Sequence, residues 1–228
     1  MHLVKLSFIA LWLTACATET THPATTVTAH WTLGDLATGR TLGCPAGFPI
    51  ARVIAQPIDG GDAIVTDFDC AAGLGVTAAL APAPYALVVQ IIAADGTAFA
   101  QATPRTIDLT DGNDARLDAT ILEDAGYAQL AWTLVDAASG AALTCAAAVI
   151  DHLVVTGTGP AGTFEDAFGC DGPGGLTSAL PAGDYTFAVA ATRLGQTVGT
   201  ASAPERASIA APNRITDLGS IPIPVTVP

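Results

Sequence analysis

Cysteine thiols are the side chains of this chain with the clearest potential for chemistry. Of its five cysteines, Cys44 and Cys70 recur about a hundred residues later as Cys145 and Cys170. Thiols form disulfides in oxidising compartments, and four thiols permit three pairings. Because the spacing repeats, we expect each pair to close within its own copy, as Cys44–Cys70 and Cys145–Cys170. A metal site with four cysteine ligands is the alternative, but no C-x-x-C spacing supports it.

Histidine and serine offer no catalytic constellation. A nucleophilic site needs a nucleophile, a base and an orienting group. The chain has no G-x-S-x-G motif, and His30 and His152 lack a matching histidine in the other copy. A lone histidine is typical of a surface residue, so we predict no catalytic residues, no cofactor and no enzymatic activity.

Acidic residues are the remaining candidates for a site. Asp108, Asp111 and Asp114 crowd one loop and could offer hard oxygen ligands to Ca²⁺. Their spacing does not match the EF-hand pattern, and the counterpart Ala211-Pro212-Asn213-Arg214 has lost the acids. We therefore regard them as weak Ca²⁺ candidates and favour a solvated turn; no metal site is predicted.

Three aromatic residues raise the question of sugar stacking. Trp31 and Trp132 begin matching runs, Trp-Thr-Leu-Gly-Asp and Trp-Thr-Leu-Val-Asp. Alternation at period two places both indoles with apolar neighbours, which favours core packing over glycan binding. Tyr127 has no counterpart in the first copy and is the more plausible exposed ring.

The chain begins with a cationic start, a short apolar run and small residues, which is typical of a secretory signal peptide. Leu13-Thr14-Ala15-Cys16 resembles the lipobox of bacterial lipoproteins. That resemblance implies a signal peptide over residues 1–15, cleavage before Cys16 and lipidation of its thiol, with residues 16–26 as lipidated cysteine and tether. Ala17 is similar to the outer-membrane sorting pattern, so we expect a cell-envelope protein, an outer-membrane lipoprotein that is periplasmic or surface-exposed.

The formal net charge is −13, and the only lysine, Lys5, belongs to the signal segment. Nucleic-acid binding needs phosphate neutralisation, so this balance argues against a nucleic-acid partner. We expect contact with the membrane through the lipid anchor alone, and the protein or glycan partner is unknown.

The repeat extends beyond the cysteines. Leu80, Tyr85 and Asn113 match Leu180, Tyr185 and Asn213, and turn signals every 8 to 12 residues separate alternating runs, as in β-sandwiches. We predict an all-β protein of two tandem Ig-like β-sandwich domains, each stapled by one disulfide, over residues 27–125 and 126–228. Pro222 and Pro224 predict that the last strand lies at a sheet edge.

Leu180-Pro181-Ala182-Gly183-Asp184-Tyr185 resembles the Leu-Pro-x-Gly-x-Tyr motif of carboxypeptidase-regulatory-like and CnaB-like modules, which are transthyretin-like sandwiches. The first copy, Leu80-Ala81-Pro82-Ala83-Pro84-Tyr85, departs from the motif, so its turn must differ. The Lys–Asn isopeptide bond of many CnaB-like domains cannot form without a lysine after Lys5.

Together these features predict a non-enzymatic, lipid-anchored lipoprotein of the cell envelope that acts as a spacer or interaction module. The alternative is a surface protein that binds a ligand, either a glycan or Ca²⁺.

Overall fold

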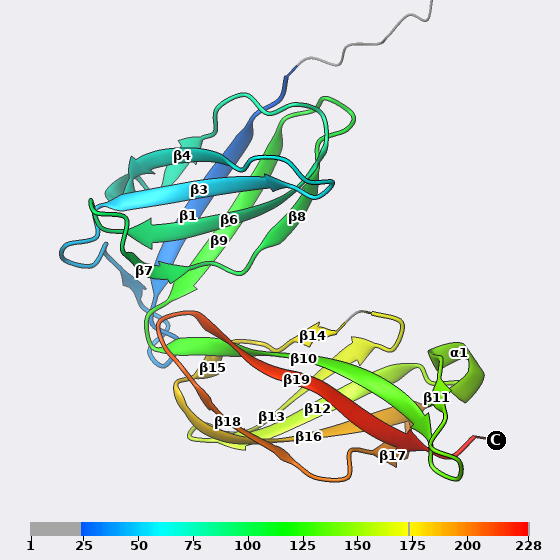
Figure 1. Ribbon diagram of the computed structural model, residues 1–228. Coiled ribbons are helices and arrows are strands. Elements are labelled where there is room, and N and C mark those ends of the chain that lie inside the picture. The colour runs from blue at the N-terminus through cyan, green and yellow to red at the C-terminus, as the bar shows by residue number, and fades with distance from the viewer. Residues whose placement is uncertain (1–23, 173, 228) are drawn as a thin grey trace, which may run out of the picture.

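A computed structural model describes residues 24–172 and 174–227, so the signal segment and Cys16 lie outside the described residues. The fold is all-β, as predicted, and consists of two sandwiches that follow one another along the chain (Figure 1). None of the helices in the described part of the chain has the length and apolarity needed to cross a membrane.

The first sandwich has two sheets. In one, β1 (Val27–Gly34) pairs antiparallel with β2 (Thr41–Leu42) and β5 (Leu74–Val76), and parallel with β9 (Ala115–Leu122). The other is antiparallel throughout and contains β3 (Ile50–Pro57), β4 (Ile64–Asp69), β6 (Pro84–Ile92), β7 (Ala98–Gln101) and β8 (Arg105–Asp108). A single 3₁₀ turn, η1 (Cys70–Ala72), follows β4.

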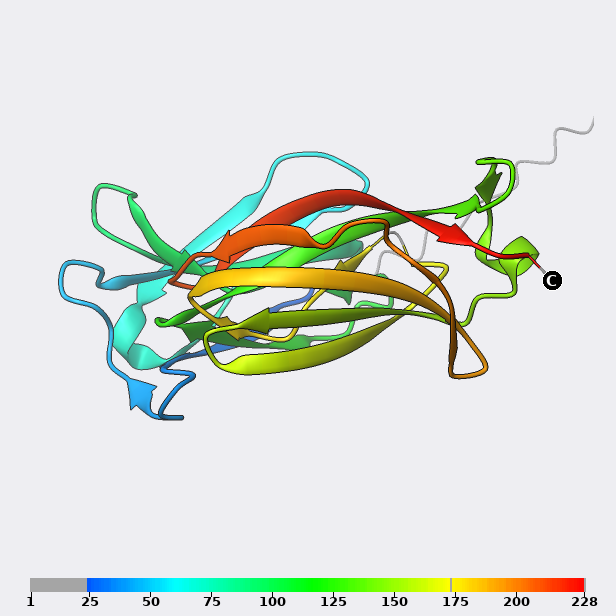
Figure 2. The same cartoon turned by 90° about the horizontal axis from the view of Figure 1, so that it is seen from below.

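The second sandwich repeats this topology with one short strand added and with a bridge that joins its two sheets. β10 (Ala125–Asp136) pairs with β11 (Ala142–Leu143), β14 (Gly175–Leu176) and β15 (Leu180–Pro181), and parallel with β19 (Arg214–Val225). The facing strands are β12 (His152–Gly159), β13 (Gly162–Gly169), β16 (Gly183–Arg193), β17 (Gln196–Thr200) and β18 (Glu205–Ile209). The long strands run away from the first sandwich toward the end that carries α1 (Cys145–Ala148) (Figures 1 and 2).

Alternation along the first strand of each copy builds the two cores. Val27, Ala29, Trp31 and Leu33 are buried in β1, and the indole of Trp31 packs against Phe68. The Nε1–H of Trp31 donates to the carbonyl oxygen of Cys70 at 2.8 Å. Both tryptophans therefore pack against the cores, as expected from the pattern.

Trp132 repeats these contacts in the second copy. It packs against Phe168 and donates to the carbonyl oxygen of Cys170 at 3.0 Å, although its own side chain is only half-buried. The equivalence shows that the repeat preserves individual contacts as well as strand order.

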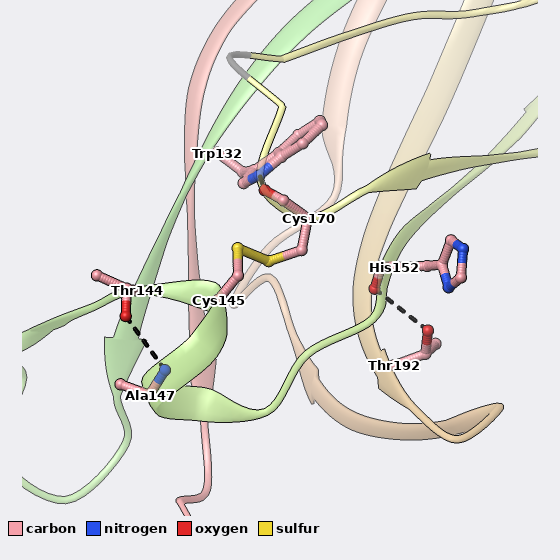
Figure 3. The surroundings of a disulfide bond; sticks show 7 residues. All are labelled: Trp132, Thr144, Cys145, Ala147, His152, Cys170 and Thr192. Carbon is pink, nitrogen blue, oxygen red and sulfur yellow. Dashed lines mark hydrogen bonds between the residues drawn. A yellow bond between two sulfur atoms is a disulfide. The ribbon is translucent and has the colours of Figure 1, made fainter.

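Each sandwich contains one disulfide, Cys44–Cys70 in the first and Cys145–Cys170 in the second, with Cα atoms 6.1 and 5.8 Å apart. Figure 3 shows the second bridge joining the start of α1 to the segment after β13, beside Trp132. Thr144 caps this short helix, because its hydroxyl oxygen accepts a hydrogen bond from the backbone N–H of Ala147 at 3.1 Å. Both bridges link segments that the strands alone leave unpaired.

The motif region differs between the copies, as the sequence predicts. Gly183 adopts a φ of 144°, which favours glycine, and β15 forms just before it. The first copy has only an isolated bridge between Thr25 and Leu80. The hydroxyl of the buried Tyr85 donates to the carbonyl oxygen of Ala81 at 3.0 Å, whereas the buried hydroxyl of Tyr185 has no partner among the described residues.

The prediction that Pro222 and Pro224 mark an edge strand is confirmed at the prolines but not at the end of β19, where the single pair Gly199–Val225 joins it to β17. β19 lies between β10 and β17. The carbonyl oxygen of Val225 accepts from Ala137 on the β10 side, and Thr226 donates to Val198 on the β17 side. The backbone N–H and C=O groups of successive residues point to opposite sides of a strand, so those of both prolines face β17. The ladder to β17 contains only one pair. The missing N–H groups of the prolines therefore break no hydrogen bond to β10.

Candidate functional site at the junction of the two sandwiches

The connection between the sandwiches is short and hydrogen-bonded on both sides. β9 ends at Leu122 and β10 begins at Ala125. The carboxylate of Asp124 accepts from the backbone N–H of Leu36 at 2.6 Å and from that of Ala37 at 2.9 Å. Its carbonyl oxygen accepts from Ala182 of the second sandwich at 2.9 Å. Asp124 thus ties the connection to a turn of the first sandwich and to a strand end of the second.

The electrostatics of Asp124 agree with this geometry. Partial burial acts to raise the pKa of its carboxyl group, but the N–H donors of Leu36 and Ala37 act in the opposite direction and prevail. The pKa is therefore lowered, and the group stays ionised in its bonded position at neutral pH.

Asn213 is the second contact across the junction and is almost completely buried. It adopts a left-handed φ of 49°, which asparagine tolerates better than most residues. Its Oδ1 accepts from the N–H of Leu122 at 2.9 Å, and its Nδ2 donates to the carbonyl oxygen of Gln101 at 2.6 Å. Its own backbone N–H donates to Ala125 at 2.6 Å. One side chain of the second sandwich therefore holds two strand ends of the first.

Sequence comparison of the copies matches Asn213 to Asn113 but does not reveal this role. Asn113 is exposed and makes none of these hydrogen bonds. Its neighbour Asp114 instead accepts from the N–H and the hydroxyl of Thr26, at 2.7 and 3.0 Å. The difference arises because only the second copy has another sandwich against this end.

A groove of about 370 Å³ lies beside the junction. The first sandwich contributes Pro104, from the loop between β7 and β8. The second sandwich contributes residues of β10, β14 and β19 and of the loop before β14, namely Gln129, Leu130, Ala131, Gly174, Gly175, Leu176 and Ile215. Seven of the eight lining residues therefore belong to the second sandwich, and Pro104 is the contribution of the first.

Tyr127 lies on the same outer face as this groove. It alternates with Gln129 along β10, and its cross-strand partner in β19 is Ile215, so both of these neighbours line the groove. The expectation of an exposed ring is wrong, because Tyr127 is half-buried at the junction. Burial raises the pKa of its hydroxyl, and the positive charge of nearby Arg105 acts to lower it.

The weak Ca²⁺ candidates do not form a cluster. Asp108 accepts from the N–H and the hydroxyl of Thr110 at 2.9 and 2.7 Å, and the donors from Thr110 lower its pKa. Asp114 is bonded to Thr26, which lowers its pKa in the same way, while Asp111 is exposed. Within residues 24–172 and 174–227, no group of three or more histidine, cysteine, aspartate or glutamate side chains is arranged to hold a metal ion.

The two histidines of the sandwiches lie far apart in the fold. His30 pairs with Asp118 across β1 and β9, and Asp118 is also ion-paired with Arg116 at 2.7 Å. His152 is exposed, and its carbonyl oxygen accepts from the hydroxyl of Thr192 at 3.2 Å (Figure 3). Neither imidazole hydrogen-bonds to another side chain in the described part of the chain.

No protein-family model and no curated protein matches this chain. Among solved structures, a leucine-rich repeat protein from Bacteroides thetaiotaomicron is similar at 14% identity with a TM-score of 0.44, and the match covers 90% of this chain but only 27% of that protein. The minor pilin GBS52 of Streptococcus agalactiae is similar at 12% identity with a TM-score of 0.31, covering 90% of this chain and 97% of the pilin. These likenesses are too distant to assign a function.

Proposed function

We propose that this chain is a non-enzymatic lipoprotein of the cell envelope that holds two firmly joined β-sandwiches away from the membrane as a spacer or interaction module. The observation that carries the proposal is the hydrogen bonding across the junction by Asp124 and Asn213. A flexible linker would need no buried side chain to connect strand ends of two domains, whereas a module that presents a surface at a defined angle does.

The lipobox supports the anchoring half of the proposal. Lipidation of Cys16 would attach the chain to a membrane, because several acyl chains anchor far better than one. The similarity of Ala17 to the outer-membrane sorting pattern points to the outer membrane. Residues 27–125 and 126–228 would then be separate domains that begin just after the tether.

A metabolic-labelling experiment tests the anchor. Cys16→Ser should abolish incorporation of radiolabelled palmitate and release the protein from the membrane fraction, because the thiol is the acylation site that the lipobox offers. The control is Cys44→Ser together with Cys70→Ser, which removes the disulfide of the first sandwich and should leave labelling intact. Palmitate that still incorporates into the Cys16→Ser variant would refute the proposed anchor.

A second candidate function, glycan binding, is favoured by the groove beside Tyr127, since ligand sites occur preferentially at domain interfaces. Calcium binding has no comparable support, because donors from Thr110 and Thr26 already occupy oxygens of Asp108 and Asp114.

A further inference from the structure

The junction groove has the size and the walls of a small-ligand site. Its volume of about 370 Å³ falls in the range of roughly 300–1,000 Å³ that is usual for such sites. Pro104, Leu176 and Ile215 give it an apolar wall. Gly174 allows the loop before β14 to approach β10 closely, because a Cβ there would lie 2.5 Å from the carbonyl oxygen of Leu130. The groove is therefore shaped by packing on both sides.

The outer face beside the groove combines an aromatic ring with hydrogen-bonding side chains. Tyr127 and Gln129 are two residues apart on β10, so their side chains emerge about 7 Å apart on one face. Asp217 is the exposed cross-strand partner of Gln129, and its Oδ1 accepts from the N–H of Gly219 at 2.8 Å, which leaves Oδ2 for a ligand. A sugar ring presents one apolar face and several hydroxyl groups, and this combination of a phenol ring, an amide and a carboxylate suits both.

The charge at the rim is unusual for this protein. In a chain of net charge −13, Arg105 begins β8 directly after Pro104, the residue by which the first sandwich lines the groove. Its guanidinium is exposed and makes no hydrogen bond or ion pair with any described residue, in contrast to Arg52 and Arg116, which are ion-paired. A free guanidinium next to the groove is suited to a carboxylate, which it binds through two parallel N–H donors.

We propose that the junction groove binds a saccharide that carries a carboxylate, a hexuronate unit, with its ring against Tyr127 and its carboxylate on Arg105. Gln129 and Asp217 bond its hydroxyl groups. This inference rests on the proposed interaction role and names the class of ligand for it. Because both sandwiches contribute, the site exists only while Asn213 and Asp124 hold the junction.

An NMR titration of the full mature chain with three small probes separates the contributions of the carboxylate and of the sugar hydroxyl groups to binding. Methyl glucuronide carries both ring and carboxylate, methyl glucoside lacks the carboxylate, and cyclohexanecarboxylate lacks the hydroxyl groups. We expect shift changes at Gln129, Ala131 and Ile215 with methyl glucuronide, and at least tenfold weaker binding of the other two probes.

Variants assign the contacts. Arg105→Gln should weaken glucuronide binding about tenfold and remove its preference over the glucoside. Tyr127→Ala should weaken binding of both sugars, whereas Tyr127→Phe should retain it. Arg116→Gln removes the same charge from the outer face of the first sandwich and should change nothing. The exposed Gln129→Ala tests the groove without a buried substitution and should also weaken binding.

Several outcomes would overturn the inference. These are shift changes away from the groove or none at all, equal binding of cyclohexanecarboxylate, or an unchanged preference in Arg105→Gln. Palmitate labelling of Cys16 is independent of these readouts, so failure of the groove site is distinguishable from failure of the proposed anchoring role.

Discussion

Replacing Asn213 should loosen the junction by an amount that follows from its contacts. Asn213→Ala removes the hydrogen bonds to Leu122 and Gln101, which costs about 1–3 kcal/mol for two partly buried bonds. Alanine also tolerates the left-handed φ of 49° at this position less well than asparagine, which costs about 1 kcal/mol more. The free energy of unfolding should therefore fall by about 2–4 kcal/mol, the sum of these two effects.

Two control variants separate these effects. Asn213→Gly loses the same side-chain bonds but accepts the left-handed φ, so it should cost about 1–3 kcal/mol. Asn113→Ala changes the exposed counterpart in the first copy and should stay within about 0.5 kcal/mol of the parent. Urea denaturation measures the unfolding free energies, and ¹⁵N relaxation reports whether the two sandwiches tumble together. If Asn213→Ala behaves like Asn113→Ala in both measurements, the reasoning about the junction is refuted.

Three further predictions concern the hydroxyl groups of Tyr85 and Tyr185, the separate folding of the two copies, and the carboxylate of Asp124. Tyr85→Phe should lower the free energy of unfolding by about 1 kcal/mol, because it removes the hydrogen bond to the carbonyl oxygen of Ala81. Tyr185→Phe should be neutral or stabilising, because it removes a buried hydroxyl that has no partner among the described residues. Equal costs of the two substitutions in urea melts would contradict this. Fragments 27–125 and 127–228 should each melt cooperatively under oxidising conditions and lose roughly 2–5 kcal/mol on reduction; fragments that are unfolded alone would show that the copies exchange strands. The pKa of Asp124 lies below its ordinary value of 3.8, so its contribution to stability is present above that pH and is lost as the pH falls through the native pKa. Asp124→Asn should therefore make the unfolding free energy less dependent on pH below about 4, and an unchanged acid profile would exclude this role.

The repeat in the sequence was sufficient to predict most of the fold. Period-two alternation is a local property, so the buried faces of β1 and of its counterpart β10 could be predicted from Val27 to Leu33 and from Ala128 to Leu134. The disulfide pairing also followed from sequence, because duplication makes pairing within each copy the simplest solution. These features depend on residues close in sequence or on a comparison of the two copies.

The junction could not be predicted, because it depends on which elements meet in space. Asn113 and Asn213 are the same residue at equivalent positions, yet only Asn213 has a neighbouring sandwich to bind. Pro222 and Pro224 predict an edge strand, but only the structure shows that the next residue, Val225, pairs with Gly199 of β17.

The chain by itself thus determined the strands, the two cores and the paired cysteines. Tertiary structure alone decided the half-burial of Tyr127 and the groove to which the first sandwich contributes Pro104. The physical reason is that alternation specifies which face of a strand is apolar, while the burial of a polar or aromatic side chain at a domain end depends on the surface packed against it.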